Sequence, residues 1–592
     1  MFDDDLHDEE TPSPGGRGLK LVPRIWPYFR KYLGRVIVAG LALTASAVMG
    51  LLGPVLVKHA IDVDIARGNV EDLMRTAVFY LLLEIGIAVA GFLQAILLAR
   101  VGQNAVADLK ESLYSHVIRL PAAFFDRNPV GRLMTRTESD AESLHQLFST
   151  TVVTLAQNVV MLVGMAVVMC LVNWKLFLVV FALLPVLGFV LYRLQNRTRG
   201  VYVAVRRTVA RINNLISEVL RALPVVQAFC REDYFTGRLD RLNEQQYRQE
   251  ERARTMWFWI WFLLDSGEVL GLALVLGAGG LWALRGWITI GGLFLFYSYI
   301  TRLFGPLRAL SNQANVIQRA FASAERIFGI FDTAPEPVGA GSRFTGLERN
   351  LELEGVDFSY EGREQALKRV SLAVRKGERV ALVGETGGGK TSIVSLVMKF
   401  YEPQSGRILL DGADLRDLDT CSLRRGIGFV PQDVILFPGT ILDNLRLFDD
   451  AVPEERVRDA AKRARLHERI LQFPEGYATN LAERGINLSL GERQLLAFAR
   501  AMVSDPDILI LDEATSSVDP QTEAMIQEGL EELTRGRTAI IIAHRLATIR
   551  MVDRILVVHQ GEITQEGRHE QLLAEDGYYR RLYRLQYLNA EA

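Results

Sequence analysis

The sequence predicts a helical membrane domain with six spans, followed by an α/β domain. Six apolar runs fall within the first half of the chain, and long basic segments separate some of them. The second half instead contains a short apolar run, a glycine-rich loop and a helical stretch, in that order. Hydrophobic residues make up 49% of the 592 residues and charged residues 23%, as expected when an apolar region is joined to an ordinary polar one.

The six apolar runs are the evidence for a membrane domain. Crossing a bilayer core of roughly 30 Å takes about 20 apolar residues in a helix. The runs are Val36–Val57, Ala77–Ala99, Thr151–Val172, Leu176–Tyr192, Met256–Leu284 and Gly291–Leu303. A buried helix of a soluble protein explains any one of them, but six in half a chain favour membrane spans.

Basic residues between the runs set the expected orientation. Arg193–Arg254 contains thirteen arginines and Arg100–Arg136 contains six basic residues, whereas the opposite loops are short. Because cytoplasmic loops carry the excess of basic residues, both termini are expected in the cytoplasm. Val106, Leu109 and Leu113 recur at helical spacing in one of these long segments, so the helices should extend beyond the bilayer.

Charged residues within or near the spans allow two interpretations. They are Glu84, Asp265, Glu268 and Arg302. Such charges usually face a bundle interior or a water-filled cavity. Contact with a substrate is one interpretation, and structural pairing between helices, or a position nearer the interface, is the other.

Composition shifts divide the chain into four expected segments. These are an acidic tail (1–20), the membrane domain (21–330), a Pro/Gly-rich linker (331–350) and the α/β domain (351–592). The three cysteines are far apart, which indicates reduced packing residues and no disulfide framework. The formal net charge of −2 gives no indication of a nucleic-acid partner.

The strongest motif of the α/β domain is a full G-x4-G-K-[ST] pattern, Gly384-Glu385-Thr386-Gly387-Gly388-Gly389-Lys390-Thr391. It follows the apolar run Val380–Val383 and precedes a helical stretch that begins at Ser392. Its glycines let backbone amides turn toward phosphate oxygens, and a helix N-terminus adds partial positive charge. Lys390 is expected to neutralise the β and γ phosphates, and Thr391 to ligate Mg²⁺. ATP and Mg²⁺ are therefore the predicted cofactors.

A second motif places two carboxylates at a strand end. The apolar run Ile508–Leu511 ends in Asp512-Glu513, the pattern of a buried parallel strand. Ligands lie at such strand ends in open α/β sheets. Asp512 is expected to hold the Mg²⁺ shell, and Glu513 to act as general base for the attacking water. Acidic residues at strand ends also serve as helix caps, so this pair alone leaves both roles open.

These two motifs and five others resemble, in their order along the chain, the nucleotide-binding domain of ABC transporters, an α/β P-loop NTPase fold. These five supply an adenine-stacking aromatic, a Q-loop glutamine, a signature motif (LSLGE), a D-loop aspartate and a switch histidine. The residues are Tyr360, Gln432, Ser489 with Gly491, Asp519 and His544. The resemblance implies a catalytic set of Lys390, Gln432, Glu513 and His544. It implies Mg²⁺ ligands at Thr391, Gln432 and Asp512, and contacts to the nucleotide from Tyr360, Gly384–Ser392, Ser489, Gly491 and Asp519.

The resemblance extends into the first half of the chain. Phe124–Asp140 resembles the first coupling-helix region of ABC exporters, and Ser217–Phe229 resembles the stretch after the second. Gln318–Asp332 resembles the exit from the sixth helix. Everything after about the first twenty residues is covered, and a membrane domain that precedes the ATPase is the exporter arrangement. The implied location is the bacterial plasma (inner) membrane, with the nucleotide-binding domain in the cytoplasm.

The signature motif departs from the family's LSGGQ. Leu490 replaces a glycine that allows close approach to the γ-phosphate, and Glu492 places a negative charge where a neutral amide is usual. Both changes are expected to weaken one composite ATP site, although Lys390, Glu513 and His544 are kept. A heterodimer, whose partner has a consensus signature and a degenerate catalytic glutamate, resolves this mismatch. A homodimer that tolerates LSLGE is the alternative.

The resemblance implies ATP-driven export of a hydrophobic or amphipathic substrate by alternating access. Small hydrophobic molecules, lipids and peptides are the substrate classes that it allows, and the residues do not choose among them. A homodimeric lipid flippase shares every motif. An ATP-gated channel or a sensor is a further alternative from another functional class.

Overall fold

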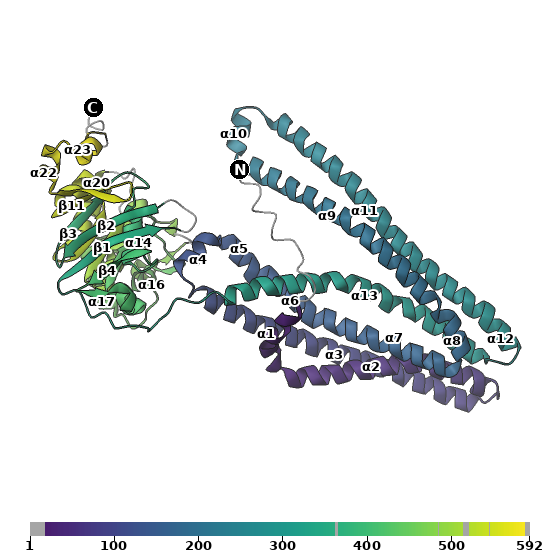
Figure 1. Cartoon of the computed structure of the whole chain (residues 1–592). Coiled ribbons are helices and arrows are strands. Elements are labelled where there is room, and N and C mark those ends of the chain that lie inside the picture. Colours follow the sequence, from purple (N-terminus) through teal and green to yellow (C-terminus); the bar gives the residue numbers. More distant parts are fainter. Residues whose placement is uncertain (1–17, 361–364, 483–484, 513–519, 544, 586–592) are drawn as a thin grey trace. The chain divides into compact units, whose positions relative to one another are not determined.

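The computed structural model describes residues 18–360, 365–482, 485–512, 520–543 and 545–585 (Figure 1). They form two compact units. The first unit runs to Ile118 and resumes over Val130–Thr333. The second contains Arg119–Pro129 together with the chain from Ala334 onward. The polypeptide therefore enters the second unit briefly before it completes the first.

The first unit is built from long helices. Its larger elements are α1 (Gly18–Arg30), α2 (Leu33–His59), α3 (Val70–Val117), α7 (Val152–Val172), α8 (Trp174–Phe181), α9 (Leu183–Arg221), α11 (Glu232–Leu274) and α13 (Ile290–Phe331). Shorter pieces are α5 (Val130–Thr135), α6 (Ala141–Gln146), α10 (Leu223–Ala228) and α12 (Gly280–Leu284). In Figure 1, α9 and α11 form a long hairpin that α10 closes.

Five helical segments of the described chain are long and apolar enough to cross a membrane. They are Leu33–Ile65, Val70–Val117, Val130–Val172, Trp174–Leu194 and Glu232–Leu284. The sixth predicted run lies in α13, which has 42 residues but carries Arg302 and Arg308 close to its apolar part and is not among the five. The structure thus shows a helical membrane domain, while the count of six spans stays a prediction.

Several helices are much longer than a span requires. α3 has 48 residues and α11 has 43, against the about 20 needed to cross the bilayer core. The late part of α3 keeps an apolar stripe, because Val106, Leu109 and Leu113 are all buried. This packing supports the part of α3 that no bilayer can cover.

Apolar side chains of five helices join in one core of the first unit. α7 contributes Met165 and Met169, and α13 contributes Phe296 and Tyr299. Tyr299 is fully buried and donates a hydrogen bond of 2.6 Å to the carbonyl of Leu51 on α2. The core therefore fixes the start of α13 against its neighbours.

Two of the intramembrane charges are paired between helices. Arg308 on α13 lies 2.5 Å from a carboxylate oxygen of Asp265 and 3.2 Å from one of Glu268, both on α11. Its guanidinium also lies over the ring of Trp261. Arg302 donates to the Gly50 carbonyl at 3.2 Å. Pairing between helices, the second interpretation of these charges, is what the structure shows for Asp265 and Glu268.

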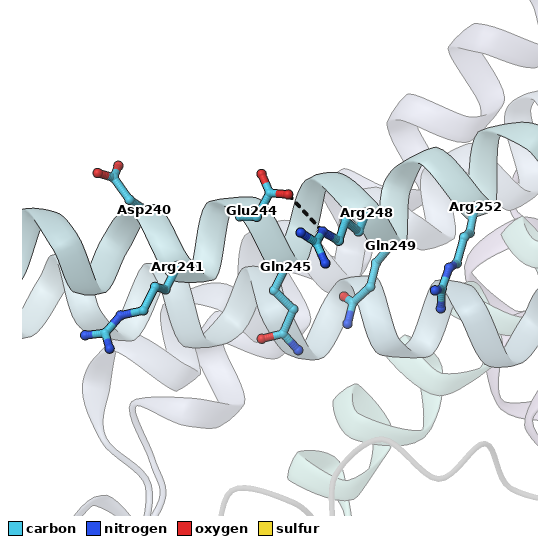
Figure 2. A pocket seen from close by; sticks show the side chains of 7 residues that line it. All are labelled: Asp240, Arg241, Glu244, Gln245, Arg248, Gln249 and Arg252. Atoms are coloured by element: carbon cyan, nitrogen blue, oxygen red, sulfur yellow. Dashed lines mark hydrogen bonds and ion pairs between the residues drawn. The ribbon is translucent and has the colours of Figure 1, made fainter.

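A polar surface runs along the long hairpin. The hollow there has a volume of about 560 Å³, and Figure 2 shows that all its lining residues come from α11: Asp240, Arg241, Glu244, Gln245, Arg248, Gln249 and Arg252. Because a single helix supplies the lining, this is an open polar face and not an enclosed ligand cavity.

The second unit contains two main sheets. The larger has strand order β12-β11-β3-β10-β9-β6 and is parallel except for β12. The smaller is antiparallel, in the order β2-β1-β4-β5. The strands are β1 (Asn350–Ser359), β2 (Gln365–Arg375), β3 (Arg379–Val383), β4 (Ser405–Leu410), β5 (Ala413–Asp414), β6 (Ile427–Val430), β9 (Ile508–Asp512), β10 (Thr538–Ile542), β11 (Arg554–His559) and β12 (Glu562–Gly567), with a separate pair of β7 (Gly439–Thr440) and β8 (Asn480–Leu481).

Helices cover the larger sheet. They include α14 (Lys390–Val397), α15 (Thr420–Arg425), α16 (Ile441–Arg446), α17 (Glu454–Arg463), α18 (His467–Leu471), α19 (Leu490–Ser504), α20 (Pro520–Thr534), α21 (Leu546–Met551), α22 (His569–Ala574) and α23 (Tyr578–Tyr583). The unit also contains the short helix α4 (Ala122–Arg127). All five residues of β10 are buried, which explains why its sequence is almost wholly apolar. One core lies among the helices and a second lies between the sheets. An apolar parallel sheet that is covered on both faces is the α/β domain that the sequence predicts.

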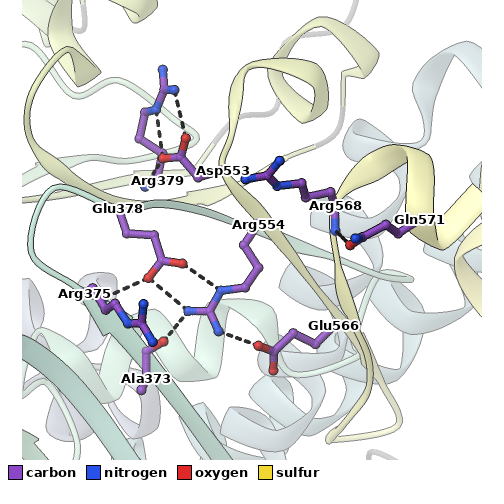
Figure 3. A network of polar contacts seen from close by, with 9 residues as sticks. All are labelled: Ala373, Arg375, Glu378, Arg379, Asp553, Arg554, Glu566, Arg568 and Gln571. Carbon is purple, nitrogen blue, oxygen red and sulfur yellow. Dashed lines mark hydrogen bonds and ion pairs between the residues drawn. The ribbon is translucent and has the colours of Figure 1, made fainter.

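An ionic network joins the beginnings of two central strands. Figure 3 shows Arg554, the first residue of β11, between Glu378 and Glu566, at 2.8 Å and 2.5 Å. Arg379 pairs with Asp553 beside it at 3.2 Å. Arg554 and Glu378 are mostly buried, with 23% and 18% of their side chains exposed. Loss of the arginine would therefore leave a carboxylate in a poorly solvated position.

Replacing Arg554 by Met should lower the free energy of unfolding by about 2 kcal/mol, since one partner of a largely buried pair is removed. Arg535→Ala is the control: its pair with Glu532 leaves 74% of the arginine side chain exposed, and the expected change is under about 0.5 kcal/mol. Thermal unfolding of the detergent-solubilised chain compares the two variants. Equal shifts in Tm would show that the network does not stabilise the sheet.

Candidate functional site

The glycine-rich loop connects β3 to α14, the order that its sequence context predicts. Gly387 and Gly389 have φ values of +83° and +107°, in the region that favours glycine. A Cβ on Gly384 would lie 2.0 Å from the carbonyl oxygen of Val558 on the neighbouring strand β11. A Cβ on Gly389 would meet the Ala366 carbonyl at 2.8 Å. The loop conformation therefore requires glycine at several of its positions.

Lys390 is the first residue of α14 and is buried, with 6% exposed. Its Nζ donates hydrogen bonds of 2.8 Å to the carbonyls of Gly384 and Glu385. Burial lowers the pKa of Lys390, while the carboxylates of Asp512 and Glu385 oppose that shift. A buried ammonium beside a glycine-rich loop at a helix N-terminus is a donor set that fits phosphate oxygens.

Strand register brings the other predicted groups to the edge of the sheet where this loop lies. Ile542 of β10 is opposite both Leu382 of β3 and Asp512 of β9. Val430 of β6 is opposite Leu511 of β9. The parallel strands thus end together, with the loop after β3, Asp512 at the end of β9 and Gln432 just beyond β6. These C-terminal strand ends are where ligands bind in open α/β sheets.

Tyr360 belongs to a cluster of three aromatic rings. Its ring centroid lies 4.8 Å from that of Phe358 and 5.1 Å from that of Tyr401, both in edge-to-face geometry. The Ser392 hydroxyl donates to the Tyr360 hydroxyl at 3.3 Å. The cluster holds Tyr360 next to the first turn of α14, so a flat aromatic group stands beside the phosphate-binding loop.

Tyr401 connects this cluster to a segment far away in the sequence. Its hydroxyl donates to a carboxylate oxygen of Asp126 on α4. The Arg119 carbonyl accepts from the Glu336 amide at 2.7 Å. Arg119–Pro129 therefore packs with the α/β unit. Sequence reasoning did not single out Tyr401, since nothing in its local pattern indicates a contact with Asp126.

The loop after Gln432 is fixed by two residues that sequence reasoning missed. Arg500 on α19 donates to the carbonyls of Ile435 and Asn444 at 2.9 Å and 3.0 Å. The Asn444 side chain is fully buried and bonds both the amide and the carbonyl of Phe437. A buried asparagine that satisfies a loop backbone has no distinctive sequence signal. The exposed Gln432 thus follows a strand and precedes a rigid loop.

Ser489 caps the N-terminus of α19 in a reciprocal capping box. Its side chain accepts from the amide of Glu492 at 3.2 Å, and the Glu492 carboxylate accepts from the amide of Ser489 at 2.8 Å. Glu492 is also ion-paired with Arg469 of α18. Gly491 is buried, whereas Leu490 is 42% exposed. The negative charge of Glu492, which was expected to weaken the composite ATP site, is therefore paired with Arg469 within the unit. Leu490 is apolar, so no such pairing offsets its bulk.

Several predicted residues lie outside the described part of the chain. They are Glu513, Asp519 and His544. Among the described residues, no group of three or more His, Cys, Asp or Glu side chains forms a metal site. Thr391 and Asp512 are oxygen donors of the kind that Mg²⁺ prefers, and Mg²⁺ is usually held by few protein ligands together with phosphate oxygens.

Comparison with known proteins is decisive for both units. Residues 36–307 match the family model described as "ABC transporter transmembrane region", and residues 367–516 match the one described as "ABC transporter". "Uncharacterized ABC transporter ATP-binding protein YfiC" of Bacillus subtilis is 35% identical over 95% of this chain and 94% of its own length. The chain belongs to the ABC transporter family.

Other relatives of this ABC transporter are named for different cargo. The "ATP-dependent lipid A-core flippase" of Syntrophus aciditrophicus is 35% identical over 96% of this chain and 94% of that protein. "Probable multidrug resistance ABC transporter ATP-binding/permease protein YheH" of Bacillus subtilis is also 35% identical, over 83% of this chain and 74% of that protein. The chain is thus an exporter-type half-transporter that binds ATP and couples its hydrolysis to transport.

Gly384→Ala should abolish MgATP binding, because the new Cβ would overlap the Val558 carbonyl and force the first residue of the loop to move. Gly387→Ala is the matched control. Its Cβ would meet open space, and only its positive φ is strained, at about 1 kcal/mol. Equilibrium binding of a fluorescent ATP analogue to the purified transporter measures both. Equal affinity in the two variants would contradict the close contact with β11.

Proposed function

We propose that this chain is one half of a dimeric ABC exporter that moves a hydrophobic or amphipathic substrate across a bacterial inner membrane by alternating access. The observation that carries this proposal is the alignment of the phosphate-binding loop, Asp512 and Gln432 at one sheet edge, in a chain that also holds the membrane domain. Six spans, cytoplasmic termini and a cytoplasmic nucleotide-binding domain belong to the same proposal. The basic loops Arg100–Arg136 and Arg193–Arg254 support this orientation.

The nucleotide site has a proposed role for each predicted group. Lys390 and the amides of Gly384–Ser392 hold the phosphates of ATP, and Tyr360 stacks on adenine. Thr391, Gln432 and Asp512 hold Mg²⁺, which neutralises developing charge when bound. Glu513 takes a proton from the attacking water, and His544 contacts the γ-phosphate. The described members Lys390, Tyr360 and Asp512 support these roles by their geometry.

In this proposal each ATP site is completed by a second chain, which supplies its signature motif. Ser489 and Gly491 of one subunit close over nucleotide held by the other subunit's loop, with Asp519 at the same interface. The partner is a different half-transporter with a consensus signature and a degenerate catalytic glutamate. Leu490 supports this asymmetry, since its exposed side chain adds bulk where glycine is usual. A homodimer is the competing arrangement.

Closure of the nucleotide-binding domains reaches the membrane helices through short cytoplasmic segments. We assign this role to Phe124–Asp140 and to Ala210–Ser217. The contact between Asp126 and Tyr401 supports the first assignment, because it joins α4 to the aromatic cluster beside the ATP loop. ATP must bind the closed state more tightly than the open state for this coupling to work.

The cargo class has two candidates. Relatives named as lipid A-core flippases favour a lipid, and a relative named for multidrug resistance favours a small hydrophobic compound. The charges Asp265, Glu268 and Arg308 are paired with one another, so they give no preference for a charged cargo. Transport of a fluorescent lipid and of a cationic dye into inside-out vesicles tests both. Movement of either against its gradient would exclude a channel or a sensor.

Glu513→Gln should lower kcat for ATP hydrolysis at least a hundredfold while ATP binding is retained, because the amide cannot accept the proton of the attacking water. Steady-state ATPase assays and binding of a fluorescent ATP analogue separate the two effects. Glu523→Gln, a change at an exposed glutamate that pairs with Arg545, serves as control and should leave kcat within twofold. A normal turnover in the Glu513 variant would contradict its role as general base.

Coexpression with the neighbouring half-transporter of the genome should give ATPase activity that is absent from this chain alone. Leu490→Gly should tighten binding of a fluorescent ATP analogue to that complex several-fold, since it restores close approach at the weaker site. Size-exclusion chromatography, ATPase assays and equilibrium binding of the analogue provide the readouts. Full activity of the chain alone, with ATP binding unchanged by Leu490→Gly, would support the homodimer instead.

A further inference from the structure

The start of the signature helix is held by a chain of three polar residues. Arg469 contacts the Glu492 carboxylate, and that carboxylate in turn accepts from the amide of Ser489. A second contact, from Arg469 to the side-chain oxygen of Gln472 at 2.7 Å, orients the guanidinium. Arg469 thus reaches Ser489 through Glu492, although the arginine lies on α18 and the other two residues form the cap of α19.

The Glu492 carboxylate is ionised and largely withdrawn from solvent. Only 12% of its side chain is exposed, against 50% for Arg469. Burial alone would raise the pKa of Glu492, but the Ser489 amide and the Arg469 guanidinium together lower it. The negative charge is therefore present at neutral pH, and its compensation comes from groups within the same unit.

That charge matters because of where the signature motif acts. In the proposed dimer, Ser489 approaches the phosphates of ATP bound by the partner, which carry several negative charges. An uncompensated carboxylate one helical turn from Ser489 would repel them, and charges near a protein surface interact over several ångströms. A guanidinium paired with that carboxylate removes most of the repulsion and leaves the cap geometry intact.

We propose that Arg469 is a positioning residue for ATP, which neutralises Glu492 and so lets the LSLGE signature close over nucleotide. This inference rests on the proposed function. It also explains how a signature with a glutamate in place of an amide can still support nucleotide binding: the glutamate takes the capping role, and an arginine on the preceding helix balances its charge. Leu490 then limits hydrolysis without preventing binding.

A charge-balancing role and a purely structural role give different results. If Arg469 only supports the fold, its replacement should raise the KM for MgATP equally whether residue 492 is charged or neutral. If Arg469 balances charge, its replacement should raise the KM for MgATP only when residue 492 is a glutamate. The double-mutant cycle between Arg469 and Glu492 separates these cases, since it isolates the interaction between the two side chains.

The experiment uses the full-length chain in the assembly that hydrolyses ATP, reconstituted in lipid, with MgATP as the probe. The variants are Arg469→Ala, Arg469→Lys, Glu492→Gln and the double change Arg469→Ala/Glu492→Gln. Arg407→Ala is the matched control, since this arginine also pairs with a glutamate, Glu354, and is 62% exposed. The apparent KM for MgATP and kcat are measured at low and high salt, and thermal unfolding reports on the fold.

Arg469→Ala should raise the KM on the order of tenfold at low salt, with a smaller change in kcat, as expected for one lost charge compensation. Arg469→Lys should recover most of the affinity. In the Glu492→Gln background, replacing Arg469 by Ala should change the KM for MgATP less than about twofold. The control Arg407→Ala should leave the KM unchanged. The increase in KM caused by Arg469→Ala should be smaller at high salt, because salt screens the charge of Glu492.

Two results would overturn the inference. One is an unchanged KM for MgATP in Arg469→Ala. The other is an equal rise in KM in Arg469→Ala and in Arg469→Ala/Glu492→Gln, accompanied by a lower Tm in both. Failure of the unmodified assembly to bind MgATP would instead overturn the proposed function itself, so the two failures are distinguishable.

Discussion

The ammonium group of Lys390 is buried at the end of a parallel sheet, and the nucleotide site is arranged around that one charge. Its hydrogen bonds go to two backbone carbonyls of the loop, which keeps the charge solvated in a region that water scarcely reaches. The glycines allow this arrangement: at Gly384 and Gly389 the neighbouring backbone leaves no room for a side chain. The site is thus built for an anion before one arrives.

The register of the parallel strands places most of the other site residues near this charge. Because β3, β9, β10 and β6 are parallel and in step, groups that lie far apart in the chain come to one edge. Loop rigidity then comes from buried polar contacts: Asn444 and Arg500 hold the backbone after Gln432, and Glu492 with Arg469 holds the cap at Ser489. The apolar sheet thus determines the position of the site, and these four polar side chains fix the conformation of its loops.

Features with a local signal could be predicted from sequence, and features made by distant contacts could not. The apolar strands β3 and β9, the phosphate loop and five membrane-crossing segments follow from short runs of residues. The sixth predicted segment is not among the five, and arginines interrupt its helix α13. The pairing of Arg308 with Asp265 and the contact between Tyr401 and Asp126 have no periodicity to reveal them. At Glu492 the S-x-x-E capping pattern was visible, but its partner Arg469 lies on another helix, so the compensation of the charge was missed.

The segment Arg119–Pro129 belongs to the second unit, although the chain on either side of it belongs to the first. During synthesis this short stretch leaves the ribosome long before Tyr401 and Glu336, the residues that it contacts. Its helix α4 has only six residues, too few to be stable by itself. The second unit therefore cannot be completed until its C-terminal part has been synthesised, although one of its segments leaves the ribosome early. A chain truncated before those residues would leave the Asp126 carboxylate and the Arg119 carbonyl without these two hydrogen-bond partners.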